Sequence, residues 1–225
     1  MSSRIESELQ DIINNDSTFS EEPKSRIEEL LMQLIGGTGG GATEPYIEET
    51  YNSSGELVDA TLHGYTKVRK YAFYKCTNLA LKSLPDGILS IDTNAFNGCT
   101  NLALTSLPNS IITIGSSAFY NCTNLALTSL PSNLLIIDST AFGDCTNLAL
   151  TSLPSRLTNI NSNAFYNCTG LTSITFEGTP QVIYSYAFNK CTALTTINVP
   201  WSEGVVANAP WGATNATINY DYTGV

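Results

Sequence analysis

The sequence is short of charge and nearly lacks histidine. Charged residues make up 13% of the 225-residue chain, half of the roughly 25% usual in soluble domains, and histidine occurs once. Ten basic residues against twenty acidic ones give a net charge of −10. This balance disfavours binding to a nucleic-acid backbone, because such binding needs a basic face. With one histidine and no cluster of acids and bases, we expect no catalytic residues and no enzyme activity.

Long apolar runs and known ligand motifs are also missing. No run of about 18 apolar residues occurs, so no helix is expected to span a membrane. The opening residues MSSRIESELQ lack both the basic region and the apolar core of a secretory signal. No P-loop, Gly-x-Ser-x-Gly or dinucleotide fingerprint is present, and we expect no cofactor. The 42% of hydrophobic residues is nonetheless enough for a buried core.

What the sequence has instead is an internal repeat of 23 residues, and one unit reads CTNLALTSLPNSIITIGSSAFYN. In each unit an isoleucine or valine precedes an Ala-Phe pair by four residues, and a Cys-Thr pair follows the phenylalanine by three. The phenylalanines are Phe73, Phe96, Phe119, Phe142, Phe165 and Phe188, and the cysteines are Cys76, Cys99, Cys122, Cys145, Cys168 and Cys191. Six units in a constant phase indicate a repeat architecture.

A single unit buries too little apolar surface to offset the conformational entropy that it loses on folding. Stacked units cover one another and share hydrogen bonds, so the repeat predicts a solenoid of parallel coils with equivalent residues aligned. The runs LALTSL and IITI are expected to be short strands, and the proline between them turns the chain. In the last two units Ile174 and Ile197 shift the apolar pattern by one residue, and there we expect a register change or a bulge.

The 23-residue pattern of Leu, Pro, Ile, Ala-Phe and Cys resembles BspA-like leucine-rich repeats over residues 58–200. The resemblance implies an elongated, non-catalytic solenoid used for adhesion or protein binding. The expected fold class is therefore a β-rich α/β solenoid, a right-handed leucine-rich-repeat coil stack preceded by short N-terminal helices. The SSAFYNCT stretch is expected to form a helical or irregular turn.

The chain divides into five segments by composition and phase. They are a helical attachment or oligomerisation segment at 1–35, a glycine-rich linker at 36–42, an N-terminal cap at 43–70, six repeats at 71–200 and a C-terminal cap at 201–225. In the N-terminal cap, residues 46–51 and 57–62 are expected to form a hairpin. After Pro200 the sequence leaves the repeat phase, and Trp201 and Trp211 are expected to cover the apolar end of the last coil.

Residues 1–35 contain two Ser-x-x-Glu capping boxes, each followed by apolar residues at helical spacing. Two predicted helices of about 11 residues are marginal alone in water, so their apolar stripes need cover. Three alternatives stay open, namely a helical hairpin, self-assembly or docking on a larger assembly, and a frayed tail. The helices and the glycine linker resemble the N-terminus of virion proteins from phages and prophages of gut Firmicutes.

The six cysteines would lie along one line of the stack, so they cannot surround a tetrahedral zinc ion, and we expect no metal site. Neighbouring Cα atoms would be near 4.8 Å apart, which permits a disulfide, but parallel Cβ directions disfavour one. We therefore favour buried free thiols over disulfides.

The residue after each Ala-Phe pair alternates between tyrosine and a smaller residue. Tyrosine recurs every second coil at Tyr74, Tyr120 and Tyr166, hence at intervals of roughly 10 Å. In one interpretation each ring packs over the gap left by its smaller neighbours. In the other, the rings form a row of exposed platforms for sugar rings or a partner protein, which makes these three tyrosines the candidate ligand-binding residues.

These observations predict a non-catalytic binding or adhesion module whose solenoid recognises a protein or glycan surface. Two settings stay open: a structural, tail-associated protein of a phage or prophage, and a bacterial cell-surface adhesin with protein-binding repeats. The corresponding locations are a virion and a cell surface. No nucleic acid and no membrane span are expected.

Overall fold

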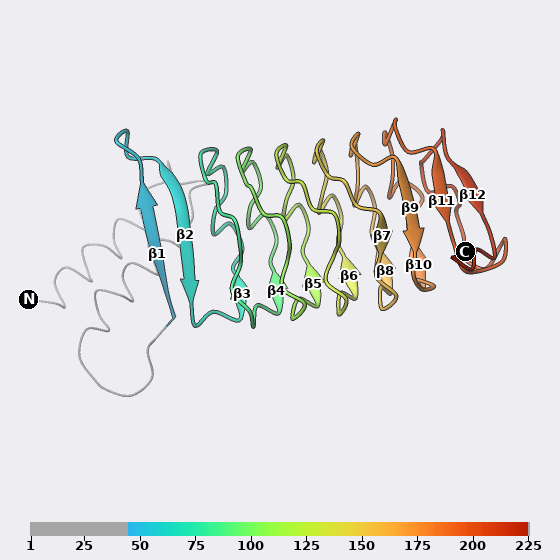
Figure 1. Cartoon of the computed structure of the whole chain (residues 1–225), viewed down its shortest axis with the longest axis horizontal. Coiled ribbons are helices and arrows are strands. Elements are labelled where there is room, and N and C mark those ends of the chain that lie inside the picture. The colour runs from blue at the N-terminus through green and yellow to red at the C-terminus, as the bar shows by residue number, and fades with distance from the viewer. Residues whose placement is uncertain (1–44, 225) are drawn as a thin grey trace, which may run out of the picture.

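The computed structural model describes residues 45–224. They form a row of stacked coils, with the first two strands at one end and the C-terminal strands at the other (Figure 1). Within these residues every regular element is a strand, so the α/β part of the expected fold class is not supported there. The stretches around each Ala-Phe pair form successive turns and no helix. The helices expected in residues 1–35 and the linker at 36–42 lie outside the described residues.

Six strands of two residues each run side by side along one side of the row. They are β3 (Lys67–Val68), β4 (Ser90–Ile91), β5 (Thr113–Ile114), β6 (Ile136–Ile137), β8 (Asn159–Ile160) and β10 (Val182–Ile183). They form one parallel sheet in the order β10-β8-β6-β5-β4-β3, and paired residues are 23 positions apart, as Ile91 and Ile114 are. The second residue of each strand is buried in the core. The alignment of equivalent residues that the repeat predicts is confirmed.

A second parallel sheet, in the order β12-β11-β9-β7, occupies the C-terminal half of the row (Figure 1). Its strands are β7 (Ser152–Leu153), β9 (Ser173–Phe176), β11 (Thr196–Asn198) and β12 (Thr217–Asn219). The register change expected near Ile174 is wrong, because Leu153 pairs with Phe176 and Ile174 with Ile197 at the constant spacing of 23.

The shifted apolar pattern is absorbed inside one unit. Leu148 and Leu153 in one coil, and Leu171 and Phe176 in the next, are buried five positions apart. Between the two buried positions of each coil lie one further buried residue and two consecutive outward-facing residues. This outward-facing pair follows the middle buried residue in the first of the two coils and precedes it in the second. The length of the unit is unchanged, so the ladder keeps its register.

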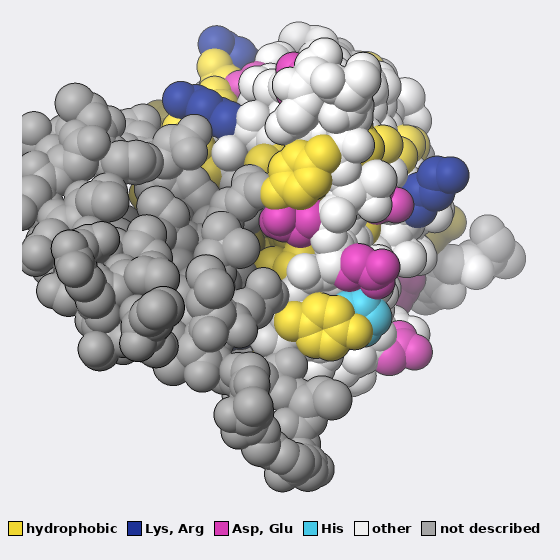
Figure 2. All heavy atoms as spheres, turned by 90° about the vertical axis from the view of Figure 1, so that its left-hand side faces the viewer, with side chains coloured by type: hydrophobic (Ala, Val, Ile, Leu, Met, Phe, Trp, Pro, Cys, Tyr) yellow, Lys and Arg dark blue, Asp and Glu magenta, His cyan; other side chains and the backbone are white. Residues whose placement is uncertain are grey.

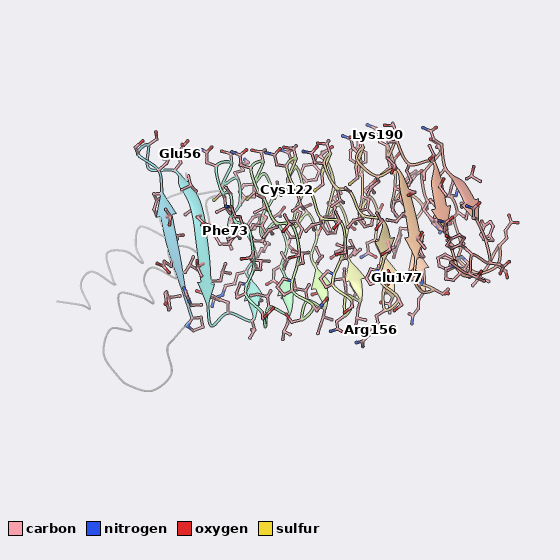
Figure 3. The ribbon with its side chains drawn as sticks, in the orientation of Figure 1. Glu56, Phe73, Cys122, Arg156, Glu177 and Lys190 are labelled. Atoms are coloured by element: carbon pink, nitrogen blue, oxygen red, sulfur yellow. The ribbon has the colours of Figure 1, made fainter. Side chains whose placement is uncertain are left out.

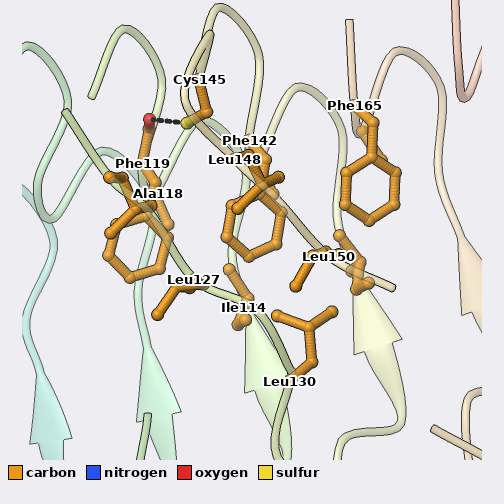
Figure 4. Packing of buried hydrophobic residues seen from close by; sticks show 14 of the residues in the cluster. Ile114, Ala118, Phe119, Leu127, Leu130, Phe142, Cys145, Leu148, Leu150 and Phe165 are labelled. Carbon is orange, nitrogen blue, oxygen red and sulfur yellow. Dashed lines mark hydrogen bonds between the residues drawn. The ribbon is translucent and has the colours of Figure 1, made fainter. Parts of the chain in front are cut away.

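The six phenylalanines form one continuous stack through the core. Successive ring centroids are 5.1–5.5 Å apart and successive ring planes are inclined by 3–9°. Figure 4 shows Phe119, Phe142 and Phe165 following one another in this way. Each ring is at most 1% exposed, so every inner ring covers both of its neighbours.

Two positions per coil adopt a left-handed backbone conformation. The stretch around Ala-Phe, for which the sequence predicted a helical or irregular turn, is therefore an irregular turn. Two residues before the phenylalanine, φ is 53–60° in the first five coils, and two residues after it φ is 55–79° in all six. The second position holds Lys75, Gly98, Asn121, Asp144, Asn167 and Lys190. Between them, each inner phenylalanine N–H donates to the alanine carbonyl of the next coil, as Phe119 does to Ala141 at 2.8 Å. These phenylalanine N–H groups thus donate to the neighbouring coil and not along a helix.

The N-terminal end is closed by the predicted hairpin, which is confirmed. Strands β1 (Tyr46–Tyr51) and β2 (Leu57–His63) pair antiparallel. Leu57, Ala60 and Leu62 of β2 join the core, and the Ala80 N–H donates to the Val58 carbonyl at 2.8 Å. The His63 ring stacks on Tyr46 with centroids 4.3 Å apart, and Figure 2 shows the histidine in cyan beside a hydrophobic and an acidic side chain.

The C-terminal cap departs from the constant spacing of the repeats. The Phe188 N–H donates to the Trp211 carbonyl at 2.9 Å, 23 positions on, whereas in the other coils the acceptor is the alanine carbonyl 22 positions on. In the strands the spacing is shorter, since Thr196 pairs with Thr217, 21 residues on. Trp201 and Trp211 are both buried against Phe176, at 5.2 and 6.0 Å between ring centroids. The expectation that the sequence leaves the repeat phase after Pro200 agrees with these altered spacings.

Candidate binding surface

The thiols are part of the core. Five of the six cysteines donate from Sγ to the phenylalanine carbonyl of the preceding coil at 2.9–3.0 Å, and Figure 4 shows Cys145 bonded to Phe119. All six are free thiols. Burial raises the pKa of Cys99, Cys122, Cys145 and Cys168, so these thiols keep their protons. In residues 45–224 no group of three or more His, Cys, Asp or Glu side chains is arranged to hold a metal ion.

The three candidate tyrosines are half-buried and lie at equivalent positions of the first, third and fifth coils. Tyr120 lies directly over Gly143 of the next coil, where an added Cβ would be 2.8 Å from the tyrosine Cδ2. Gly143 therefore provides the space that the ring occupies. For Tyr120 this contact agrees with the interpretation in which the ring packs over a smaller neighbour.

Charged side chains of the next coil hold two of the tyrosine hydroxyls. Tyr120 bonds to Asp144, and this hydrogen bond raises the pKa of Tyr120. Asp144 also accepts a hydrogen bond from Asn167 Nδ2 at 2.8 Å. Lys190 Nζ donates to the Tyr166 hydroxyl and lies 4.9 Å from the centre of its ring. The edge that carries the tyrosines is thus a connected polar band, and Figure 3 shows Lys190 on it.

The first tyrosine, Tyr74, lines a pocket of about 310 Å³ between the hairpin and the first coil. Tyr51, Glu56, Lys75 and Asn78 are also on its wall. Figure 3 places Glu56 at the same edge of the molecule as Lys190. The Lys75 ammonium lies 4.9 Å from the centre of the Tyr74 ring. The pocket combines aromatic surface with side chains that donate and accept hydrogen bonds.

The pocket exists because no coil precedes the first one. In the second coil the equivalent carbonyl, that of Asn97, accepts the Lys75 N–H at 2.7 Å. The Tyr74 carbonyl has no preceding coil to bond to, and it accepts a long hydrogen bond from the Cys76 sulfur of its own coil at 4.0 Å. Sequence reasoning singled out Tyr74 but missed the pocket, because nothing in the repeat pattern shows how far the hairpin turn stands from the first coil.

Sequence reasoning also missed an exposed apolar surface over the six-stranded sheet. Within the repeats, five large hydrophobic side chains are exposed, and all five lie on or beside this sheet. They are Leu89, Ile112, Val182, Tyr184 and Tyr186. The signal was present in the sequence as apolar residues two positions before the buried isoleucine in three successive units.

The comparisons with known proteins agree with the fold. The model of the BspA type leucine rich repeat region matches six copies over residues 66–195, which is more than half of the chain. No curated protein matches the chain significantly. In particular, no comparison supports the expected likeness of the N-terminus to phage virion proteins. In residues 45–224 there is no helix with the length and apolar character needed to cross a bilayer.

Three solved structures are similar to this chain. A leucine rich repeat protein of T. pallidum is 24% identical with a TM-score of 0.52, and the match covers 68% of this chain and 81% of that one. A leucine rich cell surface protein of Faecalibacterium prausnitzii is 19% identical with a TM-score of 0.41, covering 71% and 55%. A leucine-rich repeat protein of Bacteroides ovatus is 17% identical with a TM-score of 0.31, covering 73% and 60%. At these identities the first match supports the fold alone.

Proposed function

Because the chain belongs to the BspA-type leucine-rich repeat family, we propose that it is a non-catalytic binding module that recognises a protein or glycan surface. The tyrosine edge is the proposed contact surface. It consists of Tyr74, Tyr120 and Tyr166 with their partners Asp144 and Lys190. Aromatic rings held in place by charged neighbours bind with little loss of side-chain entropy, and they suit both sugar rings and protein side chains.

The pocket beside Tyr74 is the observation that supports this proposal most strongly. Tyr74 is on the wall of a pocket that also contains a second tyrosine, an acidic side chain and a basic one. Small-ligand sites combine apolar surface with a few convergent polar groups in a volume of about 300 Å³ or more. The pocket is the proposed anchoring point, and Tyr120 and Tyr166 extend the contact along the solenoid.

Of the two settings considered, we favour the surface adhesin over the tail-associated phage protein. The virion alternative depended on residues 1–42, which no comparison matches to a phage protein. The adhesin alternative depends on the repeats, which account for the family match. The segment division at 1–35, 36–42, 43–70, 71–200 and 201–225 is kept as part of the proposal.

The test is binding of the full chain to a printed glycan array and to an array of purified extracellular proteins. The triple variant Tyr74→Ala, Tyr120→Ala and Tyr166→Ala is expected to lose the signals that the natural chain gives. A matched control carries Thr105→Ala, Thr128→Ala and Thr151→Ala, three exposed residues at another repeat position. Unchanged binding by a tyrosine variant that melts at the same temperature as the natural chain would refute the tyrosine edge.

A further inference from the structure

The exposed apolar side chains of the repeats gather on the side of the six-stranded sheet. Leu89 is 47% exposed and Ile112 is 39% exposed, and Val182, Tyr184 and Tyr186 are 38%, 49% and 58% exposed. We call the surface formed by the outward residues on and beside strands β3 to β10 the long-sheet face. Soluble proteins seldom leave contiguous apolar surface open to water, and where they do it is typical of an interaction site.

Backbone hydrogen bonds join the apolar residues of the second, third and fourth coils on the long-sheet face. The Ile112 N–H donates to the Leu89 carbonyl at 2.8 Å, and the Leu135 N–H donates to the Ile112 carbonyl at 2.9 Å. Ile136 follows Leu135 in the chain and is linked through Asn159 to Val182 by the sheet pairing. The apolar residues therefore run from the second coil to the fourth and resume in the sixth, with the polar Thr158 and Asn159 between them in the fifth.

The two ends of the long-sheet face differ in chemistry. Its first coil carries Lys67 and Arg69, which are exposed, and Tyr71. Its sixth coil carries Val182, Tyr184 and Tyr186 at the three equivalent positions. Five of the seven basic residues in 45–224 fall between positions 67 and 82, and Arg69 lies 5.6 Å from the centre of the Tyr65 ring in its own chain. Bringing the two ends together would add the exposed rings of Tyr184 and Tyr186 to this basic end.

We propose that the long-sheet face binds a second copy of this chain in an antiparallel, two-fold symmetric dimer. The symmetry axis lies between the third and fourth coils, so the first coil faces the sixth coil of the other copy. The paired positions are Ile112 with Leu135, Arg69 with Tyr184, Tyr71 with Tyr186, and Asp92 with Asn161. Each pair occurs twice, as a two-fold interface requires, and these four pairs join side chains of matching chemistry. The same register places Val182 opposite Lys67 and Leu89 opposite Thr158, so the apolar contact is concentrated at the centre.

The alternative occupants fit this face less well. A parallel dimer would place the Lys67 and Arg69 region of one copy against the same region of the other, which like charges oppose. Residues 1–35 of the same chain carry eight acidic and three basic side chains, and Asp92 and Asp138 lie on the long-sheet face. An acidic segment is therefore a poor complement, whereas a second copy supplies cations.

The area of the face sets the expected strength. Six coils at about 4.8 Å and five strand residues at about 3.3 Å give roughly 29 by 17 Å. Two copies then bury on the order of 1,000 Å², at the lower limit for a specific interface. We expect a dissociation constant on the order of 10 μM or weaker. Tyr71, which pairs with Tyr186 in the dimer, lies 5.5 Å from Tyr74 between ring centroids, so the dimer approaches the tyrosine edge at its first coil. The two proposals are tested separately, the dimer by sedimentation and the tyrosine edge by binding to arrays.

Sedimentation velocity of the full chain from about 1 to about 300 μM tests the dimer. Ile112→Glu is expected to raise the dissociation constant at least about tenfold, because both central contacts are lost at once. Thr128→Glu, an exposed change in the same coil at another face, is the matched control and should leave it unchanged. A chain that is monomeric throughout, or a dimer that Ile112→Glu leaves intact, overturns the proposal.

A charge exchange tests the antiparallel register. Arg69→Glu removes the cation from Tyr184 of the other copy, and Tyr184→Lys places a cation against Arg69, so each change alone is expected to weaken the dimer. The double variant places the new carboxylate at position 69 of each copy against the new ammonium at position 184 of the other, and it should recover most of the lost affinity. Additive weakening in the double variant, with circular dichroism unchanged, would overturn the antiparallel arrangement.

Discussion

The thiol of Cys145 donates a hydrogen bond to the carbonyl oxygen of Phe119, 3.0 Å away in the preceding coil. The same carbonyl also accepts the Cys122 N–H at 3.1 Å, so one acceptor closes a turn within its own coil and ties it to the next. The cysteine column therefore stabilises the stack without disulfides, through donors that need a buried and protonated thiol.

Replacement of Cys145 by valine is expected to lower the free energy of unfolding by about 0.5–1.5 kcal/mol. Valine fills a similar volume but donates no hydrogen bond, and the Phe119 carbonyl keeps its backbone donor, so the loss is modest. Urea unfolding followed by circular dichroism measures it. Cys76→Val is the comparison variant, because the Cys76 thiol is half-buried and its hydrogen bond to the Tyr74 carbonyl is longer, at 4.0 Å, so a smaller loss is expected there. Equal losses in the two variants would contradict a role for the thiol hydrogen bond.

Stability is expected to fall above about pH 8.5 because of the buried thiols. Burial raises the pKa of Cys99, Cys122, Cys145 and Cys168 in the folded chain, whereas in the unfolded chain they ionise at their ordinary pKa. The stabilisation is therefore complete below the unfolded pKa and is lost as the pH rises toward the folded one. Four thiols at about 1.4 kcal/mol per pH unit, over the roughly 1.5 units from pH 8.5, set an upper limit on the order of 8 kcal/mol by pH 10.

Urea unfolding at pH 7, 8, 9 and 10 measures this loss. The matched comparison is a variant with valine at all four positions, whose profile should be flatter over the same range because the titrating groups are gone. Parallel profiles for the two chains would show that other groups govern the alkaline loss of stability.

The positions of the core columns could be predicted from the sequence, whereas the turns could not. The constant spacing of Phe119 from its equivalents, and of Ile114 from its own, dictates that they stack once coils are parallel. The left-handed backbone at Thr140 and Lys190 was not foreseen, because neither residue type favours that region and the ladder between coils imposes it.

Two further features depended on tertiary contacts that a single unit does not reveal. The bond from the Phe188 N–H to the Trp211 carbonyl could not be predicted, because Pro210 stands 23 positions after the last repeat alanine and the spacing changes there. The pairing of Tyr120 with Asp144 joins residues 24 positions apart across two coils, and it became visible only when the coils were stacked. The right-handed winding and the ligand role of the tyrosines stay predictions.

Loss of an inner ring is expected to cost more than loss of an end ring. Phe119 stacks on two phenylalanines, at 5.4 Å on each side, whereas Phe73 stacks on one. Phe119→Leu should therefore be more destabilising than Phe73→Leu by about 0.5–1.5 kcal/mol, the contribution of one aromatic pair. Chemical unfolding of both variants gives the difference. A larger loss for Phe73→Leu would mean that contacts other than the ring stack dominate the core.

Gly143 is expected to be required for the position of Tyr120. An alanine Cβ at this position would be 2.8 Å from Tyr120 Cδ2, so the ring must move away in Gly143→Ala and its bond to Asp144 must weaken. Because that bond raises the pKa of Tyr120, the phenol should then titrate at a lower pH than in the natural chain. Ultraviolet difference titration of the two chains measures the shift.

The same pair offers a coupling test of the packing interpretation. Gly143→Ala should destabilise the natural chain by about 1 kcal/mol and should cost clearly less in a Tyr120→Ala background, where no ring opposes the new methyl group. The four unfolding free energies give the coupling between the two positions. Additive effects would show that the ring does not depend on Gly143, and Tyr120 would then be free to turn toward a ligand.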